Sequence, residues 1–527
     1  MNRRHFVQYT SAGVLLPALV NGFSFRALAH SSPVMQALAP QAGEGDRVLV
    51  IVQLGGGNDG LNTVVPIDQY SQLNRLRSQV ILPESQLLPL SGLDSLALHP
   101  SMGGIRTLFD EGRAQILQSV GYPNQNFSHF RSTDIWMTGS DAEEVLNSGW
   151  TGRYLHYEYP NFPAGYPNPT MPDPLAIEIG YSLSLTLQGP MAGMGMAISD
   201  PSSFYNYIGG IPAPVPPTPA GEQLAYLRLV ANQSRLYGNS ITSAFSRVTR
   251  QRNYPARNYL ADQLKIVARL IAGGLRTRVY LVHIDGFDTH ANQVDPADHS
   301  KGQHASLLTL LSNALAAFQA DLREQGVADR VLTMTVSEFG RRIIANNSLG
   351  TDHGAAAPLL LFGDAVQGGV LGSNPVIPAS ADAEDNIPMQ FDFRSVYATV
   401  LRDWFCVPEP DMQGVILHNF PSLPLVRVST CVPDSVRELN QQAGQLLLVN
   451  YPNPFTDETR IAFESAGGQT LLQVFSSAGK LLMTPVSGDL PAGDYSWTLM
   501  GAELAPGAYY CRLQTGSLQQ VRAMIRQ

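Results

Sequence analysis

The feature that most constrains the fold is a continuous apolar run, Val48-Leu49-Val50-Ile51-Val52, which is followed by three glycines at positions 55–57. A run without polar alternation, rich in β-branched residues and ended by glycine, is typical of a parallel strand covered on both faces. An antiparallel strand with one solvated face would alternate instead. We therefore expect this run to be the first core strand of an α/β domain.

The same pattern of helix followed by apolar strand recurs along the chain. Helices are predicted over residues 101–111, 222–246, 260–273 and 304–325, and strands over 115–120, 278–283 and 330–336. This alternation predicts a mostly parallel sheet flanked by helices on both faces. Residues 159–219 are rich in Pro, Gly and Tyr, and we expect an irregular excursion over the active face.

The length of 527 residues exceeds what one hydrophobic core usually organises. After about residue 440 the sequence changes to short apolar segments separated by Gly, Pro and Ser, which predicts a small all-β sandwich. The predicted organisation is an export signal over 1–29, an α/β domain over 45–435, a linker over 436–446 and a β-sandwich over 447–527.

The N-terminus has the features of an export signal. Arg3 and Arg4 precede an apolar stretch, and Ala27-Leu28-Ala29 supplies a small-x-small cleavage site. The paired arginines before Phe6 resemble the twin-arginine pattern, and an ordinary secretory signal is the alternative. Since no other run approaches the length of a membrane span, we expect a mature protein without one.

Charge and cysteine content narrow the possible partners. The net charge of -9 is spread along the chain without a basic stripe, so nucleic acid is not an expected partner. The three cysteines form no Cys-x-x-Cys pattern. Cys406 and Cys431 either pair as the single possible disulfide or remain buried thiols.

Four segments gather groups that bind metals or act as nucleophiles, and each follows a predicted strand. In the first, residues 55–63, glycines allow close approach to a ligand and Asp59 offers a carboxylate to a divalent ion, although a plain turn explains it too. In the second, residues 126–134, Ser128 is a candidate nucleophile and Arg131 a candidate oxyanion partner. A helix N-cap is the alternative there.

The third segment, residues 283–290, places two carboxylates and two imidazoles in eight positions. Residues two apart share a face of an extended chain, so Asp288 and His290 can address one metal, as can His283 and Asp285. Asx turns with surface histidines are the alternative. His304 follows closely and either adds a ligand or begins a helix.

The fourth segment combines Glu338 and Arg341 with Asp352 and His353. A carboxylate after a strand, an arginine, and an imidazole beside an acid suit a metal site for an anionic ester. Because ligands of parallel sheets bind at the carboxyl ends of the strands, we expect the four segments to form one site.

The order of five motifs resembles the bacterial domain-of-unknown-function family 1501, a branch of the alkaline phosphatase superfamily. The motifs, which lie between Arg47 and Phe405, are GGGNDGLNTVVP, NFSHFRSTDIW, GFDTHANQ, SEFGRR and GTDHG. The resemblance implies an alkaline phosphatase-like α/β fold with a nucleophile at Ser128 and a metal cluster. The implied metal ligands are Asp59, Asp288, His290, Glu338 and His353.

The chain departs from the superfamily pattern at two points. Glu338-Phe339-Gly340 stands where the superfamily usually has Asp-His-Gly, so Asp352 or His304 substitutes for the imidazole, or one metal of the usual pair is absent. The spacing of Asp288 and His290 is tighter than usual, which leaves Asp285 as an alternative ligand. No cysteine lies in a Cys-x-Pro-x-Arg context, so formylglycine sulfatase chemistry is not indicated.

The tail is similar to the C-terminal sorting domain of the type IX secretion system. The resemblance is carried by NYPNPF at 450–455, AGK at 478–480 and LAPGAYY at 504–510. It implies contact with the secretion machinery and delivery to the outer-membrane surface or the extracellular medium.

Together these features predict an exported metal-dependent hydrolase that acts on phosphate or sulfate esters. Its cofactors would be divalent ions (Zn, Mg, Mn or Ca) and its substrate a small anionic ester. Ser128 would attack, and Arg131 or Arg341 would steady the substrate. The alternative, motivated by Phe339, is a surface-displayed binding or structural protein that keeps the fold without hydrolysis.

Overall fold

The computed structural model describes two compact units, Met1–Cys431 and Val432–Gln527. The described residues are 16–20, 23–27, 46–160, 162–199, 236–427 and 431, and in the second unit 448–451, 453, 455–465, 467–476, 480–491, 493–515 and 518–526. The predicted linker and most of the predicted export signal lie outside them. Within the signal, strands β1 (Leu16–Val20) and β2 (Phe23–Ala27) pair antiparallel.

The first unit is built on a sheet that, within the described residues, has nine strands in the order β15-β7-β14-β11-β3-β10-β8-β9, with β16 beside β7. Only β14 runs antiparallel to its neighbours in this described sheet. The strands are β3 (Val48–Gly55), β7 (Ala114–Gly121), β8 (Ala176–Ile179), β9 (Met196–Ile198), β10 (Val279–Asp285), β11 (Val331–Val336), β14 (Ala357–Phe362), β15 (Gly369–Leu371) and β16 (Phe391–Asp392).

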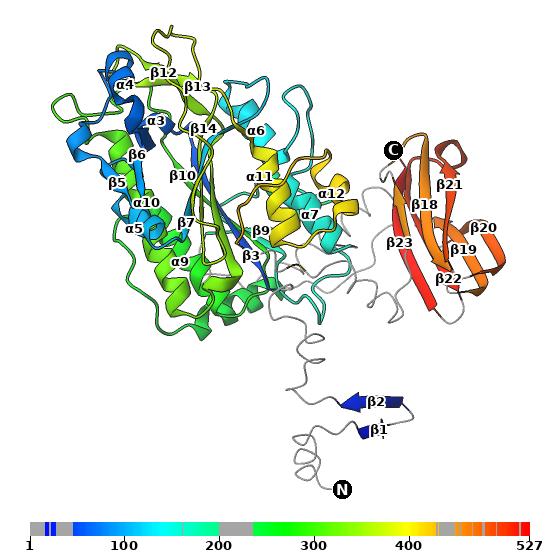
Figure 1. Ribbon diagram of the computed structural model, residues 1–527. Coiled ribbons are helices and arrows are strands. Elements are labelled where there is room, and N and C mark those ends of the chain that lie inside the picture. The colour runs from blue at the N-terminus through cyan, green and yellow to red at the C-terminus, as the bar shows by residue number, and fades with distance from the viewer. Residues whose placement is uncertain are drawn as a thin grey trace. The chain divides into compact units, whose positions relative to one another are not determined.

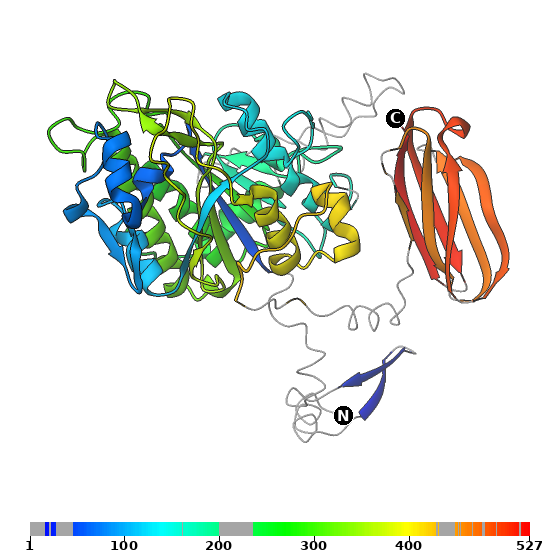
Figure 2. The ribbon, with the colours of Figure 1, turned by 45° about the horizontal axis from the view of Figure 1, so that its top comes forward.

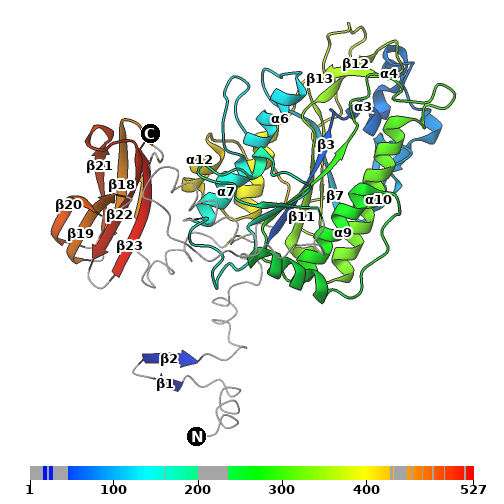
Figure 3. The same cartoon turned by 180° about the vertical axis from the view of Figure 1, so that it is seen from behind.

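Helices cover both faces of this sheet, as Figures 1 and 3 show. Along β3, Val48, Val50 and Val52 pack into one core with α5 (Gly103–Asp110), α9 (Tyr259–Ala272) and α10 (Gln303–Glu324). Leu49 and Ile51 pack on the other face with α6 (His129–Thr138), α7 (Trp150–Glu158), α11 (Phe393–Thr399) and α12 (Glu409–Ile416). The predicted α/β class and the buried first strand are therefore confirmed.

The prediction that residues 159–219 form an irregular excursion was wrong in part. Its described portion contributes β8 and β9, which extend the sheet beyond β10 in parallel register. The reason is a short apolar segment, Leu175-Ala176-Ile177, whose side chains are at most 1% exposed. Of the helix predicted over 222–246, residues 236–247 are helical and the remainder lies outside the described residues.

Smaller elements lie at the end of the sheet where β3 and β10 finish. They are α3 (Gly60–Thr63), α4 (Tyr70–Leu76), the sheet of β4 (Val64–Pro66), β5 (Leu88–Leu90) and β6 (Leu93–Leu98), and the hairpin of β12 (Gly340–Ala345) and β13 (Thr351–Gly354). Figure 1 shows β12, β13, α3 and the start of α6 at this one end of the domain. The hairpin pairs Arg341 with His353 in register.

The second unit is the predicted β-sandwich. One antiparallel sheet holds β17 (Leu448–Tyr451), β18 (Glu458–Ser465) and β21 (Gly493–Met500), and the other holds β19 (Gly468–Ser476), β20 (Leu481–Leu490), β22 (Gly507–Thr515) and β23 (Leu518–Arg526). Ile461, Phe463 and Leu499 from the first sheet share a core with Leu472, Val474 and Leu513 from the second. Figure 2 shows the two sheets face to face.

The cysteines and the longest helix complete the description. Cys406 and Cys431 form a disulfide, and Cys511 is a buried thiol. Among the described helices, α10 is the one that length and composition would allow to cross a membrane, and 67% of that stretch is buried inside the domain. Its leucines 308, 311 and 315 belong to the sheet's hydrophobic core.

Candidate metal centre

Asp288 is the centre of a cluster of imidazoles at the carboxyl edge of the sheet. Its Oδ1 lies 3.2 Å from Nε2 of His290 and 3.2 Å from Nε2 of His353. Its Oδ2 lies 3.5 Å from Nε2 of His129, the first residue of α6. Three chain segments that are far apart in sequence thus meet at one carboxylate.

Electrostatics keep this carboxylate ionised. Burial alone would raise the pKa of Asp288, but the Arg341 guanidinium and the neighbouring imidazoles outweigh it and lower the pKa to about 2. The Arg341 guanidinium donates to Asp288 Oδ1 at 2.8 Å. For His353, burial is the main cause of a lowered pKa, so the ring tends to be neutral.

Each of the three imidazoles has an oxygen acceptor at its other nitrogen. Nδ1 of His129 lies 2.8 Å from Oε1 of Glu338, and Nδ1 of His290 lies 2.9 Å from Oδ1 of Asp352. Nδ1 of His353 lies 2.7 Å from the carbonyl oxygen of Phe127. Such acceptors fix the orientation of metal-binding imidazoles in proteins.

The cluster fits a divalent ion by two further observations. Nε2 of His129 is buried and has no hydrogen-bond partner among the described residues. Ligand atoms of His129, Asp288 and His353 all lie within 4.8 Å of one another. Nitrogen and carboxylate donors at this separation suit one metal ion.

Phe339 packs against the imidazoles of His129 and His353 and is 1% exposed. Its ring centroid lies 4.9 Å from that of His129 and 4.5 Å from that of His353. Gly57, with φ +78°, lies so close that a Cβ there would be 2.3 Å from this ring. We expected the glycines after β3 to allow a ligand to approach closely. The group that lies against Gly57 is instead the side chain of Phe339.

The structure brings five of the predicted metal ligands together. Asp288, His290 and His353 face one another, while Glu338 and Asp352 bind the outer nitrogens of His129 and His290. Asp285 is the last residue of β10, and its carboxylate lies against Gly55. Among the described contacts, none joins Asp285 to the imidazoles around Asp288.

Asp59 requires a correction. It is 0% exposed and pairs with Arg77, which is also fully buried. Its Oδ2 also accepts a hydrogen bond from Gln293 at 2.6 Å. Burial raises the pKa of Asp59, but Arg77 and these hydrogen bonds outweigh it, so the pKa is lowered. The contacts of Asp59 are therefore to buried protein groups, and the cluster of imidazoles around Asp288 does not include it.

Both predicted substrate-binding arginines, Arg131 and Arg341, donate hydrogen bonds to backbone carbonyls. The side chain of Arg341 is 0% exposed, and it donates to the carbonyl oxygens of Gly57 and Thr351 as well as to Asp288. All of these contacts are to protein groups, and the ion pair with Asp288 brings Arg341 to the cluster. Arg131 donates to the carbonyl oxygens of residues 141, 142 and 144, at a loop distinct from the cluster.

Ser128 lies at the rim of the cluster. It is exposed and takes the N-cap position of α6 without a side-chain capping bond. Its two neighbours both touch the site, since the Phe127 carbonyl accepts from His353 and His129 faces Asp288.

Sequence reasoning missed His129. It was visible as an imidazole next to the predicted nucleophile in the NFSHFR motif, but its spacing matched no ligand pattern. His129 is the first residue of α6, and it joins the cluster because this helix begins next to Glu338.

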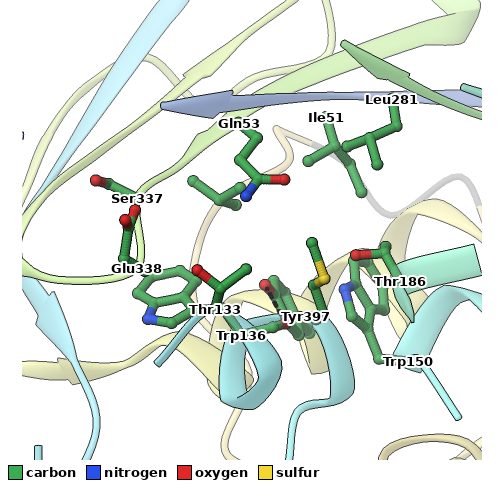
Figure 4. Close-up of a pocket in the computed structure, with 12 residues that line it drawn as sticks. Ile51, Gln53, Thr133, Trp136, Trp150, Thr186, Leu281, Ser337, Glu338 and Tyr397 are labelled. Atoms are coloured by element: carbon green, nitrogen blue, oxygen red, sulfur yellow. Dashed lines mark hydrogen bonds between the residues drawn. The ribbon is translucent and has the colours of Figure 1, made fainter. Parts of the chain in front are cut away.

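Behind Glu338 lies a small cavity of about 20 Å³, lined mainly by apolar side chains of the sheet and of α6, α7 and α11. Oε1 of Glu338 accepts from the Gly56 amide and from His129, while the buried Oε2 has no partner among the described residues. Figure 4 shows Gln53, Thr133 and Glu338 around one side of this space. The volume suits one water molecule.

Two family models match the chain. Residues 240–405 match the model described as "Protein of unknown function (DUF1501)", and residues 450–527 match the "Secretion system C-terminal sorting domain". The predicted recognition is confirmed, and the DUF1501 region includes Asp288, His290, Glu338 and His353. The sorting domain directs the protein through type IX secretion to the cell surface or the extracellular space.

Solved structures similar to the chain include proteins described as sulfatases. The PsFucS1 sulfatase from Pseudoalteromonas sp. is 11% identical with a TM-score of 0.34, over 89% of this chain and 88% of that chain. The putative sulfatase yidJ from Bacteroides fragilis is 9% identical with a TM-score of 0.31, over 80% and 86%. No curated protein matches this chain.

Proposed function

We propose that this protein is an exported metal-dependent hydrolase acting on phosphate or related sulfate esters. The supporting observation is the convergence of Asp288, His290 and His353, whose facing atoms lie 2.9–3.2 Å apart. A divalent metal held there supplies Lewis acidity, which polarises an ester oxygen and lowers the pKa of a hydroxyl or water.

The chain's own residues hold and orient this centre. Arg341 keeps Asp288 ionised, and Phe339 packs beneath two of the rings. Ser128 at the α6 N-terminus is the proposed nucleophile. Free backbone amides at a helix start stabilise the negative charge that forms when a hydroxyl loses its proton.

A second candidate is a non-catalytic binding or structural protein. The observation that favours it is the engagement of both predicted substrate-binding arginines with backbone carbonyls. An anionic ester would then depend on the metal alone for charge neutralisation.

The test is metal analysis and turnover of the purified full-length protein with an aryl phosphate, an aryl phosphodiester and an aryl sulfate. Ser128→Ala should lower turnover on the order of 10³-fold or more, as removal of a nucleophile does. Ser306→Ala, at an exposed position of α10, serves as the control. Bound metal without turnover of any ester supports the second candidate.

A further inference from the structure

The second arginine of the SEFGRR motif, Arg342, lies on the outer face of the β12–β13 hairpin. Successive side chains of a strand point to opposite faces. Because Arg341 points inward and donates to Asp288 at 2.8 Å, Arg342 points outward. Its Nε donates to the backbone carbonyl of His353 at 3.0 Å. Arg342 therefore adjoins the imidazole cluster through the His353 backbone.

Phe127 and Asp352 connect this outer face to the cluster. The centroid of the Phe127 ring lies 5.7 Å from the guanidinium carbon of Arg342, and the Phe127 carbonyl accepts from His353 at 2.7 Å. Asp352 lies 2.9 Å from Nδ1 of His290. Burial raises the pKa of Asp352, but hydrogen bonds and the charges of His290 and Arg342 lower it. The charge of Arg342 is thus felt at the rim of the cluster.

The guanidinium of Arg342 is only partly engaged by the protein. Its Nη1 donates to the carbonyl oxygen of Ala383 at 2.6 Å and lies 2.5 Å from a carboxylate oxygen of Glu384. Its Nη2 has no hydrogen-bond partner among the described residues. The side chain of Glu384 is 82% exposed. Since solvent screens such ion pairs and leaves them weak, an anion of the substrate can replace Glu384.

His353 separates the two charged positions of this end of the domain. Its ring lies 3.2 Å from Asp288, whereas its backbone carbonyl accepts from Arg342. A group bound at Asp288 and a group bound at Arg342 are therefore different parts of one substrate.

We propose that Arg342 binds a second anionic group, carried by the alcohol part of the ester, while that alcohol part lies along the ring of Phe127. The inference rests on the ester hydrolysis proposed above and names its substrate class. Ser128, the proposed nucleophile, directly follows Phe127, so an ester attacked at Ser128 and extended along the Phe127 ring ends at Arg342.

The chemistry of these two side chains defines what they bind. The Phe127 side chain is 37% exposed, and its face can stack on a flat ring. Once Glu384 is displaced, Nη1 and Nη2 of Arg342 can donate two parallel hydrogen bonds to a carboxylate or a phosphate. The substrate class is thus an ester whose alcohol contains a ring and a second negative charge.

The experiment compares para-carboxyphenyl phosphate with phenyl phosphate, which lacks the second charge, using the full-length protein. The unaltered protein should have the higher kcat/KM for the carboxylated ester. In Arg342→Gln the ratio of the two kcat/KM values should fall about 10-fold or more, because a charge-assisted pair of hydrogen bonds is lost. The loss should lie in KM, since Arg342 does not touch the bond that breaks. Arg342→Lys, which retains the charge, should restore part of the ratio.

Two further variants distinguish anion binding from damage to the hairpin. Glu384→Gln removes the competing carboxylate and should raise the ratio about threefold, a gain that a damaged hairpin cannot produce. Arg252→Gln is the matched control, because Arg252 also forms an exposed pair with a glutamate, Glu324. It should leave the ratio unchanged. A ratio that does not rise in Glu384→Gln and does not fall in Arg342→Gln overturns the inference.

Calorimetric titration with para-carboxybenzylphosphonate, which cannot be hydrolysed as an ester, gives a readout independent of turnover. It should bind more tightly than benzylphosphonate, and Arg342→Gln should abolish the difference. Equal affinities in the unaltered protein, no binding of either phosphonate, or an undiminished difference in Arg342→Gln overturns the inference even if esters are hydrolysed. A difference that depends on Arg342, without turnover of any ester, supports the anion site and overturns the hydrolase.

Discussion

Asp59 and Asp288 each follow a core strand, each was predicted to bind metal, and the structure gives them opposite surroundings. Asp59, after β3, is fully buried against Arg77. Asp288, after β10, has a side chain that is 46% exposed and is surrounded by three imidazoles. The comparison shows that a carboxylate at a strand end becomes a candidate ligand only when its neighbours leave a lone pair accessible.

The pKa does not distinguish the two aspartates. Burial raises the pKa of both, and in both a nearby arginine outweighs burial and lowers it. What differs is the remaining environment. Asp59 has two hydrogen-bond donors, Arg77 and Gln293, whereas Asp288 also lies within 3.2–3.5 Å of the Nε2 atoms of three imidazoles.

The largest expected effect is from Asp59→Asn. Removing one member of a buried ion pair leaves Arg77 buried without its counter-charge and should lower the free energy of unfolding by about 3–5 kcal/mol. Urea denaturation measures this loss. The metal affinity of the folded fraction should not change. Weakened metal binding at unaltered stability would return Asp59 to the list of ligands.

The next effect concerns pH. His304 is fully buried beside Asn58, and burial lowers its pKa to about 4. An unfolded histidine titrates near pH 6.5, so between about pH 6.5 and 4 the unfolded chain binds a proton that the folded chain does not. This group alone should therefore reduce stability by about 3 kcal/mol as pH falls through that window, with no further loss below it.

His304→Gln tests this assignment, because glutamine cannot titrate there. Denaturation curves between pH 7 and 4 should show a smaller dependence on pH than in the unaltered protein. His418→Gln, on an exposed histidine, is the matched control and should retain the original dependence. An identical pH dependence in His304→Gln and the unaltered protein would count against the role of His304.

A smaller effect on stability, but a large one on metal, is expected from Asp288→Asn. Arg341 keeps its carbonyl acceptors, so the free energy of unfolding should change less than in Asp59→Asn. Metal affinity should fall about 100-fold, equivalent to about 2.7 kcal/mol, because an anionic ligand is lost. Calorimetric titration of the two variants side by side decides whether the two aspartates differ as the structure indicates.

Much of the fold and part of the site were predictable from local pattern. Continuous apolar runs marked the core strands, and strand ends of a parallel sheet meet at one edge, which brings Asp288, His290 and Glu338 together. The strands β8 and β9 were not predictable by the same rule, because their apolar segments are three to four residues long within a Pro- and Gly-rich stretch.

The remaining site features depend on tertiary contacts that no local pattern encodes. Arg77 lies 18 residues after Asp59 and reaches it only through the packing of α4. Arg341 is buried because the loops after β3 and β10 contribute carbonyl oxygens that accept its hydrogen bonds. His129 enters the cluster because α6 begins over Glu338, and neither spacing nor composition indicates that position.

The smallest expected effect comes from the contrast between the two units. Each has its own buried core, and the tail match to a sorting domain assigns it to secretion. A chain that ends at residue 440 retains the Cys406–Cys431 disulfide and every residue of the metal cluster. Its metal affinity and esterase activity should therefore equal those of the full chain within about twofold, since no ligand is lost.

In a host with type IX secretion the shortened chain should accumulate in the periplasm, measured by fractionation, while the full chain reaches the surface. Surface delivery of the shortened chain would overturn the sorting role of the tail, and loss of metal binding would place the domain boundary elsewhere.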